Sequence, residues 1–316
     1  MIRLLLGGLS PSGKNGRFSI FIFHRVLSKP DLLFPDEPDT SRFNQILSWI
    51  KQWFNVVPLD VGIDKLKAGT LPSRAAAITF DDGYADNYTN ALPILKQHGL
   101  SATFFIATGF LDGGRMWNDI IIESIRASHS SILDLSHLGL EKPAIGSVDE
   151  KKLAITKLIT ALKYRPGNER VTMANQIAEV AKIPLPTDLM MTSLQLIAMQ
   201  AAGMKIGAHT VSHPILSQTE LTTAKQEIAE SKIQLEKLLG NEVSLFAYPN
   251  GKKFNDYLPE HADLVRELGF KAAVSTQWGA SDTNTDLFNI PRFTPWDKSK
   301  IRFGLRLVEN LRKTPN

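Results

Sequence analysis

The chain has 316 residues, of which 43% are hydrophobic and 22% are charged, a balance typical of a globular protein with enough apolar material for a large core. A formal net charge of +4 is too small to indicate a nucleic-acid-binding protein. Because cysteine is absent, disulfides and thiolate metal sites are excluded, and any metal ion must be bound by histidine and carboxylate side chains.

The first part of the chain predicts strands that alternate with helices. The apolar run 18–23 predicts a strand that ends at His24. The segment 43–53 places its apolar residues on one face, as an amphipathic helix does. The following elements are also expected: strands at 54–57, 75–80 and 102–107, and a helix at 87–97 ended by Gly99.

Residues from about 111 to 186 predict helices and loops and no strong strand. We interpret them as a mainly helical insertion on one face of a single domain of residues 1–316, not as a separate domain. Within the insertion, Trp117, Asn118 and Asp119 are candidates for substrate contact, although a tryptophan in such a place is more typically a packing anchor.

Regular alternation resumes after the insertion, with a strand at 204–208 that ends at His209. The segment 217–220 has the spacing of a capping box, and the helix after it is expected to end at Gly240. The remaining expected elements are strands at 243–247, 272–275 and 288–290 and a helix that closes at 264–268. About eight strands alternating with helices predict an α/β fold with a parallel sheet or a (β/α) barrel.

Polar side chains follow the C-terminal ends of these predicted strands, which in a barrel converge on one mouth where active sites lie. They are His24, Asp81, Asp82, His209, residues 248–251 and Arg292. Adjacent carboxylates at the end of a buried strand repel each other and are costly to desolvate, so such a pair is usually kept for a cation or for proton transfer.

Two imidazoles, His209 and His213, can join Asp82 at one metal ion. Pro214 disfavours a helix at His213, so a loop or single turn is expected there. Two histidines and one carboxylate leave coordination positions open, as in a catalytic site, and they suit Zn²⁺ or another divalent ion. Asp81 is then left as a general base; the alternative is that Asp81 caps the following helix.

The segments Thr79–Gly83 (Thr-Phe-Asp-Asp-Gly) and His209–His213 (His-Thr-Val-Ser-His) resemble, in this order, the first two motifs of the polysaccharide deacetylases with NodB homology. The resemblance spans roughly residues 18–292, apart from the insertion. It implies a distorted (β/α) barrel and metal-dependent removal of acyl groups, usually N-acetyl, from amino sugars. It also implies that Asp81 is the general base and that Asp82 binds the metal.

The third motif of the family, Arg-x-Pro-Tyr-Gly, is matched only in part by residues 247–251, where Ala247 takes the place of the arginine. The resemblance implies oxyanion and substrate binding by Tyr248, Pro249 and Asn250, with the backbone N–H of Asn250 as the oxyanion donor. The missing arginine orients the base in the family. Arg292 is the candidate to replace it, with a structural role as the alternative.

The family's C-terminal Leu-x-His motif, which supplies the general acid, is absent, because no histidine follows His261. Residues 22–24 (Ile-Phe-His) are similar to the element that supplies this histidine in circularly permuted deacetylases of exopolysaccharide export. This resemblance implies that His24 protonates the leaving amine; the alternative is a buried histidine bonded to backbone.

We therefore expect a deacetylase of an amino-sugar glycan or glycolipid, of the bacterial exopolysaccharide-associated branch. One alternative is a hydrolase of a small amide or imide on the same fold. Another is a glycan-binding protein without activity, which only the loss of the motif-three arginine supports.

The apolar start, residues 1–9, is too short for a signal peptide, and no run is long enough for a membrane span. The expected location is the cytoplasm, with a lipid-linked precursor at the inner membrane face as a place of action. The basic, amphipathic segment 301–313 predicts a closing helix packed on the core, with peripheral membrane contact as the alternative.

Overall fold

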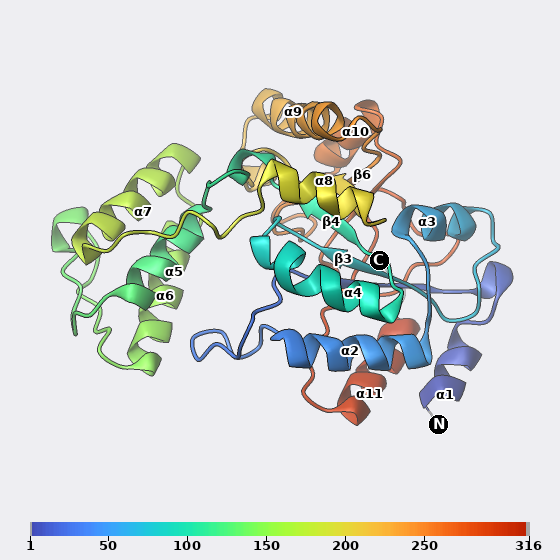
Figure 1. The fold of residues 1–316 in the computed structure, drawn as a ribbon. Helices are drawn as coiled ribbons and strands as arrows, with labels where there is room; N and C mark the ends of the chain where they lie inside the picture. Colours follow the sequence, from blue (N-terminus) through green and yellow to red (C-terminus); the bar gives the residue numbers. More distant parts are fainter. Residues whose placement is uncertain (1, 314–316) are drawn as a thin grey trace.

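A computed structural model describes residues 2–313 of the chain. Its centre is a curled parallel sheet surrounded by helices (Figure 1). The strand order is β1-β3-β4-β5-β6-β7, and β2 also pairs with β3. The strands are β1 (Phe18–Phe23), β2 (Asn55–Val56), β3 (Ala75–Phe80), β4 (Thr103–Ile106), β5 (Lys205–Ala208), β6 (Leu245–Ala247) and β7 (Ala272–Val274). The predicted distorted (β/α) barrel is confirmed.

An irregular segment closes the barrel between β7 and β1. Ile290 forms a parallel bridge with Val274 of β7, and Phe293 forms one with Phe21 of β1. The strand predicted at 288–290 is therefore wrong: single bridges on two sides take its place, because Pro291 lacks the N–H that a continuing ladder needs. The segment still carries the chain across the gap and brings Arg292 to the barrel.

Alternate residues of each strand face the barrel interior. The inward-facing residues of β3 and β5 lead to the candidate site residues at the barrel mouth. On β3, Ala75 and Ala77 pack inside with Phe105 of β4. The same side of the chain continues to Thr79 and then to Asp81 at the mouth. On β5, Gly207 faces Phe105 so closely that a Cβ would lie 2.5 Å from the ring, and the inward row continues to His209.

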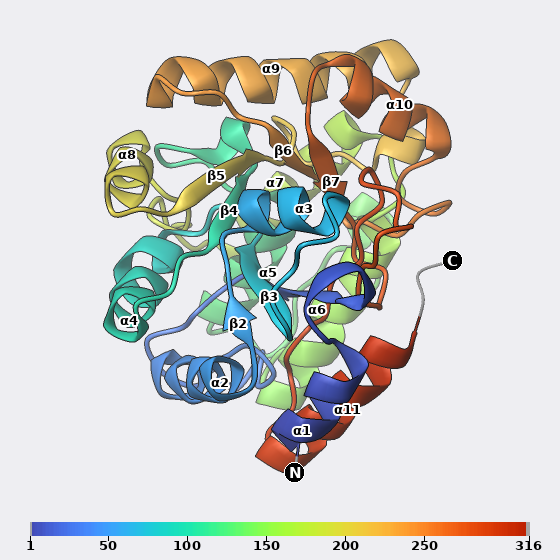
Figure 2. The ribbon, with the colours of Figure 1, turned by 90° about the vertical axis from the view of Figure 1, so that its right-hand side faces the viewer.

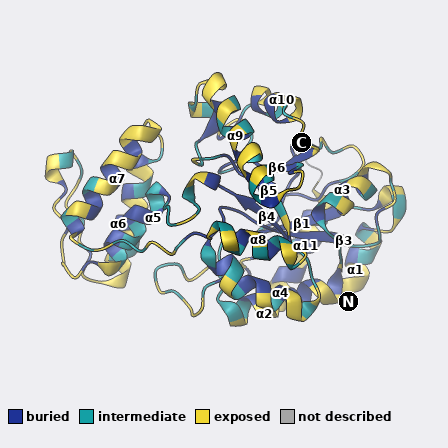
Figure 3. Cartoon of the chain, turned by 45° about the horizontal axis from the view of Figure 1, so that its top comes forward, coloured by how far each residue is buried: buried dark blue, intermediate teal, exposed yellow. Residues whose placement is uncertain are grey.

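Helices cover the outside of the sheet, with their outer faces exposed and the strands buried (Figure 3). The helices covering the sheet are α1 (Ile2–Leu9), α2 (Thr40–Trp53), α3 (Leu59–Lys67), α4 (Leu92–His98), α8 (Ser193–Ala201), α9 (Leu221–Leu239), α10 (Pro259–Glu267) and α11 (Lys300–Arg312). Three more, α5 (Trp117–Ala127), α6 (Val148–Leu162) and α7 (Gly167–Ala181), lie beside the barrel (Figure 1). A single π-helical turn, Asn87–Ala91, precedes α4.

The predicted start of α9 needs a correction. Ser217 lies in a 3₁₀ turn and donates its hydroxyl to the carbonyl of Asn255 at 2.5 Å, so it does not cap the helix. The helix begins at Leu221 without a side-chain cap. Its end is as expected, because Gly240 adopts the left-handed conformation that terminates helices.

The insertion forms a lobe of three helices, α5 to α7, beside the barrel (Figure 1). It has a hydrophobic core of its own, distinct from the barrel core. Trp117 packs against this lobe core, with the Arg170 guanidinium 5.0 Å from its ring, which is the packing role expected of it. Whether the lobe belongs to one domain with the barrel stays a prediction, and Met1 and residues 314–316 lie outside the described residues.

The C-terminal helix α11 packs on the barrel and against α1 (Figure 2). Phe303, Leu307 and Leu311 on its apolar face are buried in the main core, which is the packing role that the sequence predicted. Ile301 and Leu305 remain exposed on the same helix. Between residues 2 and 313, no helix combines the length and apolar character needed to cross a membrane.

Candidate active site and metal centre

Asp81 and Arg292 form a buried ion pair at the barrel mouth. The two guanidinium nitrogens of Arg292 donate to the two carboxylate oxygens of Asp81 at 2.7 and 2.6 Å. Arg292 also donates to Thr79 Oγ1 and to the carbonyl of Ser275. Burial alone would raise the pKa of Asp81, but the charge and hydrogen bonds of Arg292, with the nearby charge of His209, outweigh it and lower that pKa. Asp81 is therefore a carboxylate at neutral pH.

Asp82, His209 and His213 bring one donor atom each to a common point, with these atoms within 4.8 Å of one another. The Nε2 atoms of both histidines lie 3.4 Å from the same oxygen, Oδ1 of Asp82. Ligands of a tetrahedral zinc ion with bonds of about 2.0–2.2 Å are about 3.3–3.6 Å apart. The separations of 3.4 Å are too long for good hydrogen bonds and match the edge of such a coordination shell.

Hydrogen bonding and burial prepare the two imidazoles for a cation. Nδ1 of His209 lies 2.7 Å from the carbonyl of Ala247, so Nδ1 carries the hydrogen and Nε2 faces Asp82. Burial lowers the pKa of His213 to about 4, so this imidazole is neutral at physiological pH. Burial would also lower the pKa of His209, but the neighbouring carboxylates of Asp82 and Asp81 raise it. The centre thus favours a positive charge beside Asp82, as a proton or as a metal ion.

The backbone at this centre is strained. Asp82, His213 and Asn250 have positive φ angles of 76°, 54° and 60°. Non-glycine residues avoid this region, and each such residue costs about 1–3 kcal/mol. Such strain is common at functional sites, and two of these residues, Asp82 and His213, belong to the converging donor set.

Glu227 of α9, which the sequence did not single out, holds the loop that carries His213. Its carboxylate accepts hydrogen bonds from the backbone N–H groups of Val211 and Ser212 at 2.9 and 2.8 Å, and from the Ser212 hydroxyl at 2.7 Å. Thr210 Oγ1 accepts a further bond from the N–H of His213. A polar residue on an exposed helix face gives no signal of this role in the sequence.

The third motif needs a correction at Tyr248. The Tyr248 side chain is fully buried, stacks on Tyr257 at 3.7 Å and donates its hydroxyl to the carbonyl of Phe288. Its side chain therefore packs in the core and does not line the barrel mouth. Pro249 is also buried and shapes the turn. Asn250 is partly exposed, and its backbone N–H donates no hydrogen bond among the described residues, which leaves it free as a donor.

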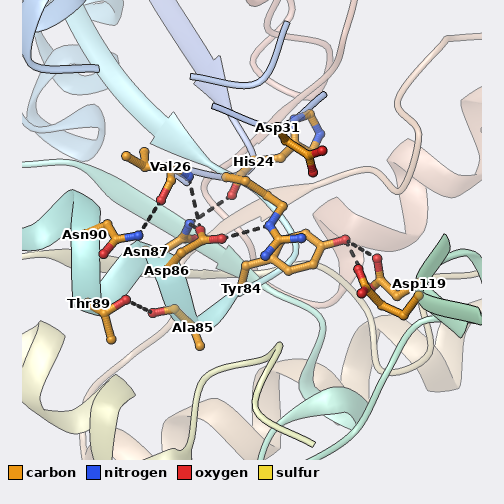
Figure 4. Close-up of polar contacts among 12 residues, drawn as sticks. His24, Val26, Asp31, Tyr84, Ala85, Asp86, Asn87, Thr89, Asn90 and Asp119 are labelled. Carbon is orange, nitrogen blue, oxygen red and sulfur yellow. Dashed lines mark hydrogen bonds and ion pairs between the residues drawn. The ribbon is translucent and has the colours of Figure 1, made fainter. Parts of the chain in front are cut away.

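His24 is half-buried and directly follows β1. The residues after β3 hold the segment around it by hydrogen bonds (Figure 4). Asp86 binds Arg25 Nε at 2.8 Å and the N–H of Val26 at 3.1 Å. Asn87 donates to the carbonyl of His24 at 2.9 Å. These contacts hold the backbone of His24 and leave its ring free to line a cavity that also reaches Asp82.

This cavity has a volume of about 330 Å³ and lies between the barrel mouth, the loop after β1 and helix α5 of the insertion. It is lined by His24, Arg25, Leu27, Asp31, Phe34, Glu37, Asp82, Tyr84, Asn118, Asp119, Ile122, Arg126 and Ile159. A larger cavity, of about 510 Å³, lies at the N-terminal ends of β5 and β6 and contains none of the site residues. Of the predicted site residues, His24 and Asp82 thus line the smaller of these two cavities.

Solved deacetylases share this fold. The deacetylase PplD of Streptococcus pyogenes in complex with acetate matches with a TM-score of 0.61 at 19% identity, over 93% of this chain and 98% of that one. IcaB of Ammonifex degensii matches with a TM-score of 0.58 at 18% identity, over 96% and 99% of the chains. The deacetylase domain of BpsB from Bordetella bronchiseptica matches with a TM-score of 0.55 at 18% identity, over 88% and 95%.

The family model "Polysaccharide deacetylase" matches residues 68–131 and 175–273, about half of the chain, including both motifs. YxkH of Bacillus subtilis (strain 168), whose name places it among the polysaccharide deacetylases, is 21% identical over 281 residues, which cover 88% of this chain and 71% of the relative. The chain belongs to the polysaccharide deacetylase family. It is accordingly a hydrolase of the class that deacetylates glycans.

Proposed function

We propose that this enzyme removes N-acetyl groups from amino sugars of a polysaccharide or lipid-linked glycan, with the help of a divalent metal ion. The substrate belongs to the exopolysaccharide type that the sequence resemblance indicates. One observation carries the proposal: a donor set of Asp82, His209 and His213 lies directly beside the Asp81–Arg292 ion pair. A binding protein needs no carboxylate base next to such a centre.

Asp82, His209 and His213 would hold the metal ion, and the nitrogen and oxygen donors suit Zn²⁺. When bound, a divalent ion supplies positive charge that makes a water more acidic and polarises an amide carbonyl. The raised pKa of His209 means that ion binding and proton binding compete there, so affinity rises with pH.

Two side chains of the protein carry out the proton transfers, Asp81 as the base and His24 as the acid. Asp81 accepts a proton from the attacking water, and Arg292 fixes both carboxylate oxygens so that one of them faces the reacting centre. The N–H of Asn250 donates to the oxygen of the acetyl carbonyl as it gains negative charge. His24 gives a proton to the sugar nitrogen as its bond to the acetyl carbon breaks, and acetate and a free amine result.

The substitution of the motif-three arginine by Ala247 no longer favours a non-catalytic glycan-binding protein. That alternative depended on the missing arginine of the third motif. The guanidinium of Arg292 supplies the equivalent positive charge to Asp81 from another segment of the chain.

Acetate release tests the proposal. The purified enzyme, loaded with zinc, is incubated with N-acetylglucosamine oligomers and, separately, with small amides and cyclic imides. We expect acetate from the oligomers, no turnover with the Asp82→Ala variant, and full turnover with Glu230→Ala, a control on the exposed face of α9. Turnover of the small amides alone would favour the small-amide alternative, and tight oligomer binding without any hydrolysis would favour the binding protein.

We also propose peripheral membrane contact, restricted to the side chains that α11 and α1 leave exposed. Ile301 and Leu305 of α11 and Leu4 and Leu5 of α1 are exposed, and the two helices pack together (Figure 2). Exposed apolar side chains beside arginine and lysine are typical of interfacial helices. Co-sedimentation with vesicles that contain anionic lipid should fall when Ile301 and Leu305 are changed to serine; equal binding by both proteins would contradict the contact.

A further inference from the structure

The cavity beside the candidate active site contains a carboxylate to which the proposed mechanism gives no role. Asp119 lies in the first turn of α5, the first helix of the insertion, and only 3% of its surface is exposed. Both of its oxygens lie near the hydroxyl of Tyr84, at 3.1 and 3.2 Å. Figure 4 shows the Tyr84 side chain reaching from the end of β3 to Asp119.

Asp119 has far more hydrogen-bonding capacity than the protein uses. A carboxylate can accept about four hydrogen bonds. Among the described residues, the Tyr84 hydroxyl is the one side-chain donor to Asp119. Burial raises the pKa of Asp119 to about 7, so keeping this carboxyl here is costly. The structure thus retains a buried, under-satisfied acceptor that faces a cavity.

The charge of Arg25 acts against the raised pKa of Asp119, but Arg25 forms no ion pair with Asp119 among the described residues. Arg25 stacks over the ring of Tyr84, with 4.5 Å between the guanidinium carbon and the ring centre. Its Nε donates to Asp86 at 2.8 Å, so its ion pair is with Asp86 on the opposite side of that ring. The missing donors must come from whatever fills the cavity.

Metal binding does not explain this carboxylate. Among residues 2–313, the one group of three histidine and acidic side chains with converging donor atoms is Asp82, His209 and His213. Asp119 is not part of it. The cavity walls instead combine this acceptor with the apolar side chains of Phe34, Ile122 and Ile159 and the ring of Tyr84. A flat ring with apolar C–H faces and hydroxyl groups at its edge is complementary to such walls.

We propose that Asp119 is a specificity-determining residue of a sugar subsite, where its carboxylate accepts hydrogen bonds from hydroxyl groups of the hexosamine ring that presents its acetamido group to Asp81 and Asp82. The inference rests on the proposed function and names the sugar-binding residue of that site. The volume of about 330 Å³ is at the lower end of the range of about 300–1,000 Å³ for small-ligand pockets. Helix α5 of the insertion thereby contributes the side chain that selects the sugar.

The charge of the cavity restricts the sugar further. Glu37 and Asp119 face the same space, while the two arginines of its wall are already paired, Arg25 with Asp86 at 2.8 Å and Arg126 with Asp31 at 2.7 Å. A carboxylate or phosphate on the bound ring would be repelled by these acidic groups. The subsite therefore takes a neutral N-acetylhexosamine in preference to an N-acetylated uronic acid or a sugar phosphate.

Binding, not turnover, tests the subsite. Isothermal titration calorimetry with the N-acetylglucosamine trimer is carried out on the Asp81→Asn protein, in which the sugar is not consumed. Adding Asp119→Asn keeps the shape but removes the charge and one acceptor, and we expect the Kd to rise about tenfold or more. Asp149→Asn makes the same change on the exposed surface of α6 and serves as the matched control. The control should leave the Kd unchanged.

The outcomes separate this inference from the proposed function. The subsite is overturned if adding Asp119→Asn changes the Kd of the Asp81→Asn protein by less than twofold. It is also overturned if the Asp81→Asn protein does not bind the trimer. If the Asp81→Asn protein binds the trimer but the wild type releases no acetate, the proposed function fails. The subsite is then judged by the ratio of the Kd values with and without Asp119→Asn. In the active enzyme, Asp119→Asn should raise KM for the trimer with a smaller change in kcat; a loss confined to kcat would assign Asp119 a different role.

Discussion

Arg292 and Asp81, 211 positions apart in the sequence, meet in a two-pronged ion pair with nitrogen–oxygen distances of 2.7 and 2.6 Å. The segment that closes the barrel between β7 and β1 carries the arginine to this place. The guanidinium is thus supplied from outside the third motif, where Ala247 stands. Asp81 lies beside Asp82, so one residue of the acidic pair is bound to arginine and the other faces the histidines.

Arg292→Lys should reduce kcat by about 10- to 100-fold without loss of metal, because lysine keeps the charge but cannot hold both carboxylate oxygens in one plane. The pKa of Asp81 should rise towards its ordinary value, so the acid limb of the pH profile of kcat/KM moves to higher pH. Arg266→Lys, at an exposed ion pair, is the control. An acid limb that stays in place would show that Arg292 does not tune Asp81.

His24→Gln should reduce kcat for an N-acetylated sugar by about 100-fold, because an amine leaves slowly unless its nitrogen is protonated. The loss should be at least tenfold smaller for 4-nitrophenyl acetate, whose leaving group departs as an anion. Both substrates are measured side by side, with His98→Gln as the surface control. Equal losses on the two substrates would argue for a structural role of His24.

Glu227→Ala should weaken metal binding about tenfold, because the loop of Val211 and Ser212 loses the carboxylate that holds it and His213 with it. Competition with a chelator measures the affinity, and Glu230→Ala on the same helix is the control. If the affinity is unchanged while thermal stability falls, Glu227 serves the fold and not the centre.

Asp119 should make stability fall as pH rises. Burial raises its folded-state pKa to about 7, above the unfolded value of 3.8, so the folded state binds more protons between these pH values and loses stability up to about pH 7. The difference is about 4 kcal/mol at most. Asp119→Asn should therefore raise Tm relative to the wild type by several degrees at pH 8 and by less at pH 5. A Tm difference independent of pH would contradict the raised pKa.

Much of the fold follows from local pattern. β1 and β3 have the predicted bounds, because each is a mostly apolar run without glycine or proline that is followed by a polar residue. Gly240 ends α9 as predicted. The predictions for 288–290 and for the capping box failed where a tertiary contact competes with a local preference: Ile290 pairs with β7 by one bridge, and Ser217 bonds to Asn255.

The candidate site also contains residues that the sequence predicted and residues that it did not. Asp82, His209 and His213 were predicted because strand ends meet at a barrel mouth and the residue types suit a metal ion. Tyr248 was misplaced, because nothing in its motif shows that Tyr257 and the Phe288 carbonyl hold it in the core. Contacts between distant polar residues on helices leave no periodic signal, so Glu227 was not predicted at all.

The metal content of the purified protein shows whether Asp82 and Asp81 have separate roles. Elemental analysis is carried out on the wild type, Asp81→Asn and Asp82→Ala after loading with zinc and removal of excess ion. We expect about one ion per chain in the wild type and in Asp81→Asn, and a large loss in Asp82→Ala. Asp81→Asn should nevertheless release no acetate. A wild type that holds no ion, or equal loss of metal in both variants, would contradict the division between a metal-binding and a proton-accepting aspartate.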